Sequence, residues 1–229
     1  MRWFGMALLL AALQEPEKKF VPTDQYEKRV HEGWTLYVNR ALLGGAYAEV
    51  GRRALRLLEF KLEEVARLVP ERPLSELRKV PIWLGVNDYL EDRACYHPSA
   101  DWLRKNGLNP DKAKAVEIGS AATFLRHIRD QPMMVVHELA HAYHDRVLSF
   151  EHPGILEAYR KAKEAGLYEK VLRINGRRER AYAVKNHHEY FAEASEAYFG
   201  TNDFFPFVRP ELKEHDPEVY AILEEVWGR

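Results

Sequence analysis

The sequence has few of the features that mark disulfide-stabilised, repetitive or nucleic-acid-binding proteins. Cys95 is the single cysteine in 229 residues, so no intrachain disulfide can form and the core must hold the fold. The net charge of −1 gives no long-range field toward nucleic acid or an anionic membrane. No internal repeat or low-complexity segment is visible. The 46% hydrophobic content is enough for one domain with a sizeable core.

The N-terminus carries an apolar run that is too short to span a bilayer as a helix. Arg2 precedes an apolar segment from Met6 to Leu13, a combination typical of a secretory signal peptide. We predict a signal peptide over residues 1–14, one domain over residues 15–229 with its catalytic core at about 115–205, and no membrane span. The protein is then secreted, periplasmic or held at the cell envelope. An ordinary apolar N-terminus on a cytoplasmic protein is the alternative, and the oligomeric state is left open.

The motif His-Glu-Leu-Ala-His at residues 137–141 lies in an apolar stretch without proline or glycine. On a helix, His137 and His141 are one turn apart on the same face, so both imidazoles can bind one Zn²⁺. Glu138 can reach a water on the open side of that metal, as metal-assisted hydrolysis requires. The motif is short, and two solvated histidines on an amphipathic helix are the alternative.

A catalytic zinc usually has three protein ligands and a water, so a third ligand is needed. His144 lies on the same helix face as His137, but the seven residues between them rise about 10 Å along a helix. One ion therefore cannot bind both. We predict that His144 lines the pocket or supports a ligand, with a plain surface histidine as an equal alternative.

A second helix is predicted over residues 187–199, where apolar residues recur at helical spacing. Glu189 and Glu193 lie one turn apart on one face of it. Glu189 can bind the metal while Glu193 accepts the free ring N–H of a ligand histidine, a bond that fixes the tautomer. From the residues alone, a solvated acidic face is an equal alternative.

The two motifs together resemble the catalytic domain of the anthrax lethal factor-like zinc metallopeptidases, which are of the gluzincin type. That family has H-E-x-x-H on one helix and E-[FY]-F-A-E on a later one. Here these are residues 137–141 and residues 189–193, which read Glu-Tyr-Phe-Ala-Glu. The family also has a tyrosine seven residues before the third ligand, and Tyr182 stands at that position. The match is specific between about residues 130 and 205.

The resemblance implies both a fold and a set of roles. The fold is α+β and zincin-like, with a small mixed β-sheet, an active-site helix and a helical C-terminal part. One Zn²⁺ is bound by three ligands: His137, His141 and Glu189. Glu138 is the general base, Tyr182 donates to the developing oxyanion, and Glu193 supports a ligand histidine. The large toxins of the family carry further domains for which this chain has no room, so their targets do not carry over.

The residues around Tyr182 favour a β-hairpin. Asn175 and Gly176 form a strong two-residue turn signal between two runs with strand potential. Tyr182 is then expected near the end of the second strand, where its phenol can face the metal and stabilise transition-state charge. A cross-strand packing role is the alternative from the residues alone. His187 and His188 are alternative donors.

Apolar patterning predicts the remaining elements. Strands are expected over 32–38, 80–86 and 113–118, and helices over 46–69, 154–166 and 217–227. In the resembling fold, a strand just before the zinc helix borders the substrate cleft. Our candidate for that edge strand, which would hold an extended substrate by main-chain bonds, is Val116, Glu117 and Ile118. An ordinary edge strand is the alternative.

These expectations converge on a zinc metalloendopeptidase that acts on peptide or protein substrates and on no nucleic acid. Glu138 takes a proton from water and passes it to the leaving amine. One alternative is an exported zinc-binding protein without peptidase activity. Another is a non-catalytic interaction domain in which the histidines are incidental. The sequence does not identify the substrate or the cleavage-site preference.

Overall fold

The computed structural model describes residues 20–88 and 94–228. The predicted signal peptide lies outside these residues, so export and the domain limits stay predictions. Within the described part of the chain, no helix is long and apolar enough to cross a membrane.

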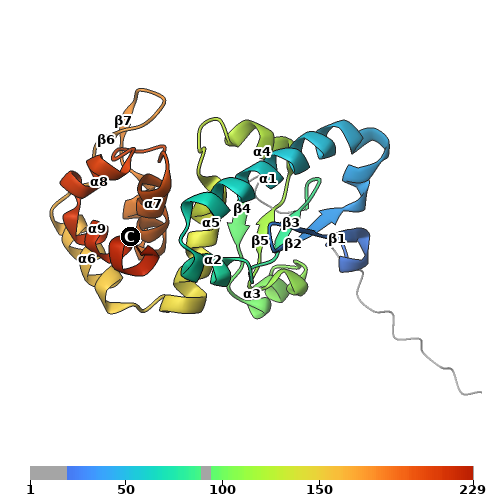
Figure 1. Cartoon of the computed structure of the whole chain (residues 1–229), viewed down its shortest axis with the longest axis horizontal. Coiled ribbons are helices and arrows are strands. Elements are labelled where there is room, and N and C mark those ends of the chain that lie inside the picture. The colour runs from blue at the N-terminus through green and yellow to red at the C-terminus, as the bar shows by residue number, and fades with distance from the viewer. Residues whose placement is uncertain (1–19, 89–93, 229) are drawn as a thin grey trace, which may run out of the picture.

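The chain forms two halves, one containing the main sheet and one made mostly of helices (Figure 1). The N-terminal half contains strands β1 (Tyr26–His31), β2 (Trp34–Asn39), β3 (Ile82–Leu84), β4 (Ala94–Tyr96) and β5 (Val116–Ile118), and helices α1 (Ala48–Leu68), α2 (Glu71–Leu77), α3 (Ala100–Lys105), α4 (Ala121–His127) and α5 (Met134–Tyr143). The C-terminal half contains the π-helical turn η5 (His144–Leu148), α6 (Pro153–Glu164), β6 (Val171–Leu172), β7 (Arg178–Glu179), the 3-10 helix η6 (Tyr182–Val184), α7 (His187–Phe199), α8 (Arg209–His215) and α9 (Pro217–Trp227). The expected α+β class, with a small mixed sheet and a helical C-terminal part, is confirmed.

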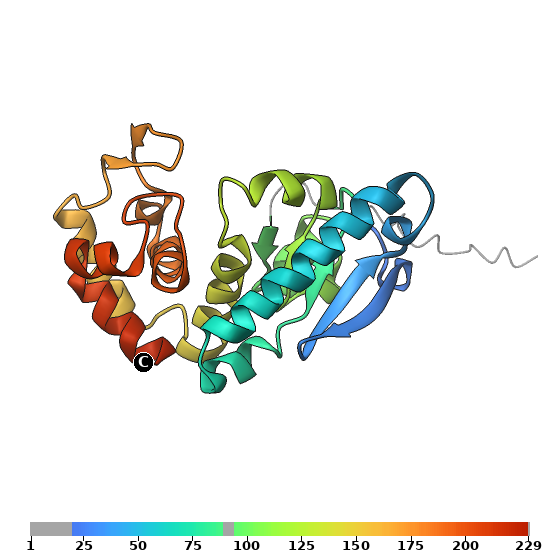
Figure 2. The ribbon, with the colours of Figure 1, turned by 45° about the horizontal axis from the view of Figure 1, so that its top comes forward.

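The main sheet has the strand order β1-β2-β3-β5-β4. Strands β2, β3 and β5 are parallel, while β1 and β4 run antiparallel to their neighbours at the two ends. One face is apolar and packs into the core, with Leu36, Ile82 and Val116 paired in register across it. Helix α1 lies along this half and packs against α4 (Figure 2).

Residues Val116, Glu117 and Ile118 form β5, which is an interior strand and not the edge. The prediction that they form the edge strand is therefore wrong, because β4 pairs with β5 on its outer side. The Glu117 carboxylate is buried against His97, with 2.8 Å between Oε2 and Nε2, and forms an ion pair with buried Lys112. Glu117 is thus a structural residue beneath the strand that does form the edge.

Most predicted elements are confirmed with small shifts at their ends. Helix α1 fits the expected range 46–69, and α6 and α9 fit 154–166 and 217–227. Strands β2, β3 and β5 fall within or beside the expected ranges, and all three are shorter than expected. Strand β1 is missed by the sequence reading, as are helices α2, α3, α4 and α8. Strand β4 is missed as well.

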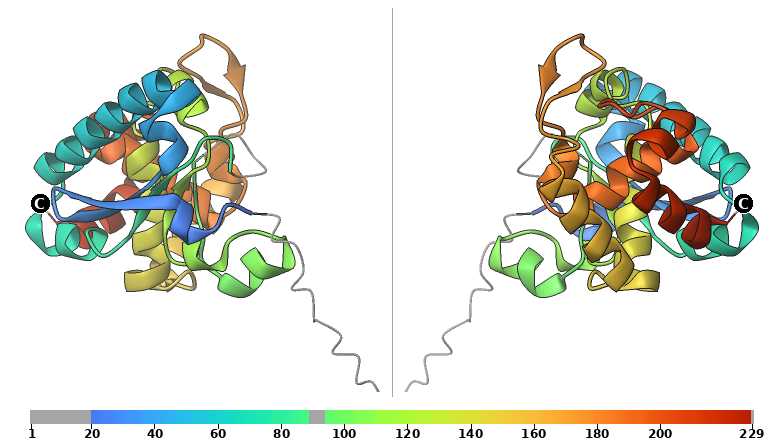
Figure 3. Two further views of the ribbon diagram at one scale, coloured as in Figure 1. Left: turned by 90° about the vertical axis from the view of Figure 1, so that its right-hand side faces the viewer. Right: turned by 90° about the vertical axis from the view of Figure 1, so that its left-hand side faces the viewer.

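The two predicted site helices, α5 and α7, pack against each other at the junction of the two halves. Trp227 of α9 is buried behind them, with its ring 4.6 Å from that of Tyr143 and 5.8 Å from that of Phe191. Its indole N–H donates to Ser195 Oγ at 3.1 Å. The C-terminal helices therefore form the support on which α7 meets α5 (Figure 3).

The expected hairpin around Asn175 and Gly176 is confirmed as β6 and β7, which are antiparallel. Gly176 has φ +85°, which glycine adopts without steric cost. The hairpin projects from the C-terminal half in every view (Figures 1, 2 and 3). Tyr182 does not lie on its second strand, because β7 ends at Glu179 and Tyr182 begins the 3-10 helix η6.

Candidate metal centre and catalytic cleft

Local sequence sets the positions of the three predicted ligands. Helix α5 runs from Met134 to Tyr143 and places His137 and His141 one turn apart. Helix α7 is capped by Asn186, whose side-chain oxygen accepts the backbone N–H groups of His188 and Glu189 at 2.9 Å. This cap fixes the start of α7 and puts Glu189 in its first turn, facing α5.

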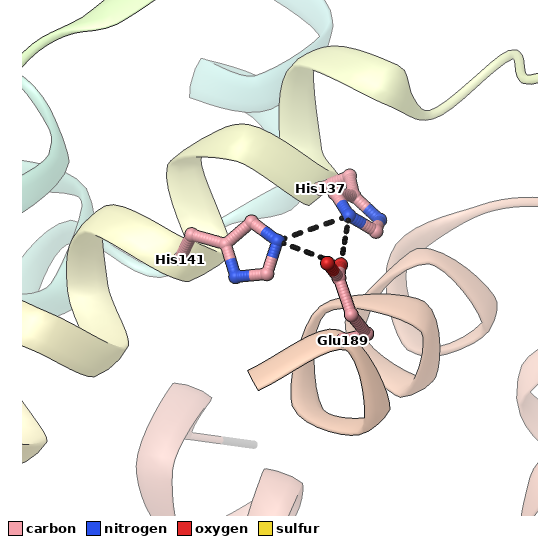
Figure 4. A group of neighbouring side chains, drawn as sticks. All are labelled: His137, His141 and Glu189. Atoms are coloured by element: carbon pink, nitrogen blue, oxygen red, sulfur yellow. Dashed lines mark hydrogen bonds and ion pairs between the residues drawn. The ribbon is translucent and has the colours of Figure 1, made fainter. Parts of the chain in front are cut away.

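The structure brings the three side chains together (Figure 4). His141 Nε2 lies 3.1 Å from His137 Nε2, and Glu189 Oε2 lies 3.2 Å from His137 Nε2 and 3.0 Å from His141 Nε2. A tetrahedral zinc with bonds of about 2.0–2.2 Å separates its ligand atoms by about 3.3 Å. Two imidazole nitrogens and one carboxylate oxygen at this spacing fit one zinc ion and leave a coordination position for water.

The hydrogen bond on the far side of the His137 ring supports this fit. His137 Nδ1 lies 2.7 Å from Glu196 Oε1, so Nδ1 carries a proton and donates it. In the neutral ring, Nε2 then presents a bare lone pair toward a carboxylate oxygen of Glu189. Two lone pairs at 3.2 Å repel unless a cation lies between them. The arrangement is stable with a metal ion or a proton at this point.

The same hydrogen bonds shift the pKa values of His137 and Glu189 in the metal-free protein. Burial alone lowers the pKa of His137, but its hydrogen bonds to Glu189 and Glu196 outweigh burial and raise the pKa well above the ordinary value. Burial favours the neutral form of Glu189, yet the two histidines hold its pKa well below the usual range. The centre therefore stabilises positive charge at the point where the three ligand atoms meet.

Glu196, and not Glu193, accepts the ring N–H of His137. Glu196 is two turns after Glu189 on the same face of α7, and it meets the histidine that comes first on α5. Glu193 is buried and accepts from Asn202 Nδ2 at 3.3 Å. Burial and the neighbouring Glu196 raise the pKa of Glu193 well above its ordinary value. The sequence signal for Glu196 was its i, i+7 spacing from Glu189, which the family motif does not include.

Glu138 is oriented by the edge strand of the sheet. Its Oε2 accepts the backbone N–H of Tyr96 in β4 at 2.8 Å. The Tyr96 phenol in turn donates to Asp145 Oδ2 at 2.6 Å, just beyond the end of α5. Tyr96 thus connects β4 to Glu138 of α5 and to Asp145 just beyond it, and holds the Glu138 carboxylate beside the predicted metal ligands. Sequence reasoning missed Tyr96 because nothing in the pattern marked residues 94–96 as a strand.

Tyr182 lines the same cleft as the three ligands. Its phenolic oxygen accepts a hydrogen bond from Lys185 Nζ at 2.5 Å, which leaves the phenolic hydrogen available to donate. Lys185 Nζ also lies 3.4 Å from Glu189 Oε1. The hydrogen bond to Tyr182, more than the nearby Glu189, raises the pKa of Lys185. The Lys185 ammonium therefore orients this phenol. Lys185 was not among the site residues predicted from the sequence.

His144 is placed differently from both expectations. It is fully buried, and neither ring nitrogen has a hydrogen-bond partner among the described residues. Its ring packs against Phe150 and Phe191, with centroids 5.2 and 4.9 Å away. Burial, with a smaller contribution from His188, lowers the pKa of His144 to about 3. His144 is therefore a neutral packing residue behind the centre. It makes no hydrogen bond to a ligand.

The centre opens into a cleft of about 840 Å³ between the two halves. The wall from the N-terminal half includes Ala94, Cys95, Tyr96, His127, Asp130 and Gln131. The wall from the C-terminal half includes Arg173, Arg180, Tyr182, Lys185, His188 and Phe204. Strand β4 is therefore the sheet edge beside the metal centre, in the place that the sequence reading gave to residues 116–118.

Comparisons with known proteins identify the family. Among solved structures, the Pro-Pro endopeptidase PPEP-2 from Paenibacillus alvei is similar at 21% identity and a TM-score of 0.43, over 80% of this chain and 92% of that chain. No protein of curated function matches the chain. Residues 93–226 match the family model described as "Anthrax toxin lethal factor, N- and C-terminal domain", which includes β4, α5, Tyr182 and α7. The match covers more than half of the chain, which therefore belongs to the anthrax toxin lethal factor family of metallopeptidases.

Proposed function

We propose that the protein is a zinc-dependent endopeptidase and that His137, His141 and Glu189 hold its single zinc ion. The observation that carries this proposal is the convergence of three ligand atoms within 3.2 Å beside Glu138, in a cleft wide enough for a peptide. When bound, zinc polarises a carbonyl and makes water more acidic. The donor set matches the zinc centres of hydrolytic enzymes.

The side chains of this protein perform the proton transfers in the proposed reaction. Glu138 removes a proton from the attacking water as the new C–O bond forms, and it delivers that proton to the amide nitrogen as the C–N bond breaks. The Tyr96 N–H keeps the carboxylate pointed into the cleft during both transfers. Because Glu138 ends in its starting form, the products are one carboxylic acid and one amine.

Tyr182 is the proposed donor to the oxyanion. Its hydroxyl accepts from Lys185 and can donate its own hydrogen to negative charge that develops on the scissile carbonyl. Such a bond is stronger in the transition state than in the ground state and therefore accelerates the chemical step. His188 also lines the cleft, but burial and then His187 lower its pKa to about 4. A neutral ring can still donate through one nitrogen, so His188 is the alternative donor.

The test combines metal analysis with peptide cleavage. Purified protein is expected to contain one zinc per chain and to cleave members of a diverse internally quenched peptide library. Glu138→Gln should keep its zinc and lose cleavage, because the amide cannot accept the proton. Glu151→Gln, at an exposed position outside the cleft lining, is the matched control and should cleave normally.

Each alternative predicts a different result. Full zinc occupancy without cleavage of any library member would support a metal-binding protein that is not a peptidase. Zinc far below one per chain after gentle purification would support an interaction domain. Normal cleavage by Glu138→Gln would refute the mechanism while leaving the zinc site in place.

A further inference from the structure

The β6–β7 hairpin carries a net positive charge, whereas the whole chain is close to neutral. Lysine plus arginine and aspartate plus glutamate number 34 and 35 in the whole sequence. Residues 169–180, which we name the basic hairpin, contain five basic residues and two acidic residues. The basic residues are Lys170, Arg173, Arg177, Arg178 and Arg180. An excess of three positive charges in twelve residues stands out against a chain with a net charge of −1.

Most of this charge is not neutralised within the described structure. Arg173 is the exception, since it pairs with Asp203 and Glu179 at 3.1 Å and holds the hairpin to the body. Arg180 has one partner, Glu169, and both side chains are about half exposed, so solvent screens this pair.

The remaining three cations, at positions 170, 177 and 178, are exposed. They have no ion-pair partner among the described residues. These groups are available to an incoming ligand.

The basic hairpin is part of the cleft and not a remote surface. Arg173 and Arg180 line the same cleft as the metal ligands. Across from the hairpin, α4 ends at His127, and Arg126 and Arg129 near that end are exposed (Figures 1 and 2). His127 lines the cleft on that side, so the C-terminal end of α4 and the basic hairpin border the same cleft.

Most of the carboxylates in the cleft already have polar partners. Glu138 and Glu189 are engaged with Tyr96 and with the ligand histidines, and Asp203 is paired with Arg173. Glu193 is buried and accepts a hydrogen bond from Asn202. Among the described lining residues, Asp130 is the acid that is exposed.

We propose that the basic hairpin selects peptide substrates that carry acidic side chains on one flank of the scissile bond. This inference rests on the proposed peptidase function. Aspartate or glutamate on that flank would lie near guanidinium groups, whose planar N–H donors match carboxylates. Because these groups are exposed, they act mainly on encounter and on selection among substrates. A nucleic acid fits less well, because the positive charge is confined to one end of a cleft in a chain of near-zero net charge.

The kinetic test uses matched peptides. A neutral peptide that the protein cleaves is changed to carry glutamate, or lysine, at positions flanking the scissile bond. On one flank, the glutamate peptide should have a kcat/KM at least about tenfold above that of the lysine peptide. The difference should shrink as NaCl rises from about 0.02 M to about 0.3 M, because salt screens exposed charges.

Charge reversal in the hairpin supplies the variants. The double variant Arg177→Glu, Arg178→Glu should lose or invert the preference, while cleavage of the neutral parent peptide changes less than about twofold. Arg53→Glu, Arg56→Glu on α1 is the matched control, because both positions are exposed and lie outside the cleft lining. It should keep the preference of the wild type. Thermal unfolding confirms that each variant is folded.

A binding measurement separates this inference from the peptidase proposal. Fluorescence anisotropy with the Glu138→Gln variant and labelled glutamate and lysine peptides reports on selection without turnover. Tighter, salt-sensitive binding of the glutamate peptide that disappears in the hairpin variant supports the inference even if no peptide is cleaved.

Three results would overturn the inference. Cleavage without any difference between the glutamate and lysine peptides refutes it and leaves the peptidase function standing. Equal binding of both peptides by Glu138→Gln also refutes it. Binding of a single-stranded RNA through Arg177 and Arg178 more tightly than the acidic peptide would assign the basic hairpin to another ligand.

Discussion

His137 Nδ1 donates a hydrogen bond to Glu196 Oε1 over 2.7 Å, and this bond connects the two site helices behind the metal position. It fixes the tautomer that leaves Nε2 free for a metal, and it keeps the ring in the plane that meets His141 and Glu189. Gln131 Nε2 also donates to the same Glu196 oxygen at 3.0 Å. The second oxygen, Oε2, is buried and has no partner among the described residues. The hydrogen-bonded oxygen of Glu196 is thus shared between His137 and Gln131.

Removal of the negative charge at Glu196 should weaken zinc binding. We expect Glu196→Gln to lower zinc affinity by about 10–100-fold, because the amide oxygen holds the ring less strongly than a carboxylate. Competition with a chromophoric chelator measures the affinity. Glu193→Gln is the control and should change it less than about threefold, since an amide resembles the neutral acid that the buried Glu193 favours. The opposite ranking of the two variants would indicate that Glu193, and not Glu196, supports the ring of His137.

The metal-free protein should lose stability as the pH rises above 6.5. The pKa of His137 is raised, so its contribution is complete below its ordinary value of 6.5 and is lost as pH rises through the raised value. The pKa of Glu189 is lowered, so its contribution is present above 4.5 and is lost only on acidification. The pKa values of His144 and His188 are lowered, so these two residues reduce stability only below pH 6.5.

Thermal unfolding in a chelator between about pH 6 and pH 9 checks this expectation. The unfolding midpoint of the metal-free protein should fall across this range. The zinc-loaded protein is the comparison and should change less, because the metal replaces the proton between the ligands. A midpoint that rises with pH in chelator would contradict the protonation of His137 described above.

Loss of the Tyr182 hydroxyl should slow the chemical step. We expect Tyr182→Phe to lower kcat by about 10²–10³-fold with little change in KM, as for removal of one oxyanion donor. Zinc content should stay the same, since the phenol is not a ligand. Lys185→Met tests the orienting cation and should lower kcat less than Tyr182→Phe does. A Tyr182→Phe variant that keeps the wild-type kcat would favour His188 as the oxyanion donor.

Truncation of Trp227 should destabilise the junction of the two site helices. The side chain is 1% exposed and packs against rings from both α5 and α7. Trp227→Ala should lower the free energy of unfolding by about 3–5 kcal/mol, measured by guanidinium denaturation. Trp102→Ala is the control, because that indole is 48% exposed and should cost less than about 1 kcal/mol. Equal losses in both variants would mean that Trp227 is not a support of the site.

The sequence was sufficient for the parts of the site that lie on regular helices. The helices that carry His137, His141 and Glu189 follow from helical spacing, which is a local property, and the expected ligand role of Glu189 follows from the family resemblance. Glu196 and Lys185 were missed for a different reason. Their roles depend on how α7 lies against α5 and on how η6 turns toward the cleft, and no local spacing encodes either arrangement.

The same distinction explains the errors in the fold. Long amphipathic helices such as α1 were predicted within two residues at each end, because apolar residues recur at helical spacing along them. Strand β4 has three residues, and its pairing with β5 is a tertiary contact. With β4 missed, residues 116–118 were taken as the edge of the sheet. Short strands depend on their contacts with neighbouring strands, so their own residues do not predict their place in a sheet.

Under the proposed peptidase function, strand β4 sets a condition on any substrate that pairs with it. A chain that pairs with a sheet edge must be extended, at about 3.3 Å per residue, and a helix or a tight turn cannot meet that edge. A folded target must therefore expose a linker or tail, or locally unfold, before its peptide bond reaches Glu138. The rate of attack on a given protein would then follow the opening equilibrium of the target segment. Cleavage would report on the local stability of the target as much as on its sequence.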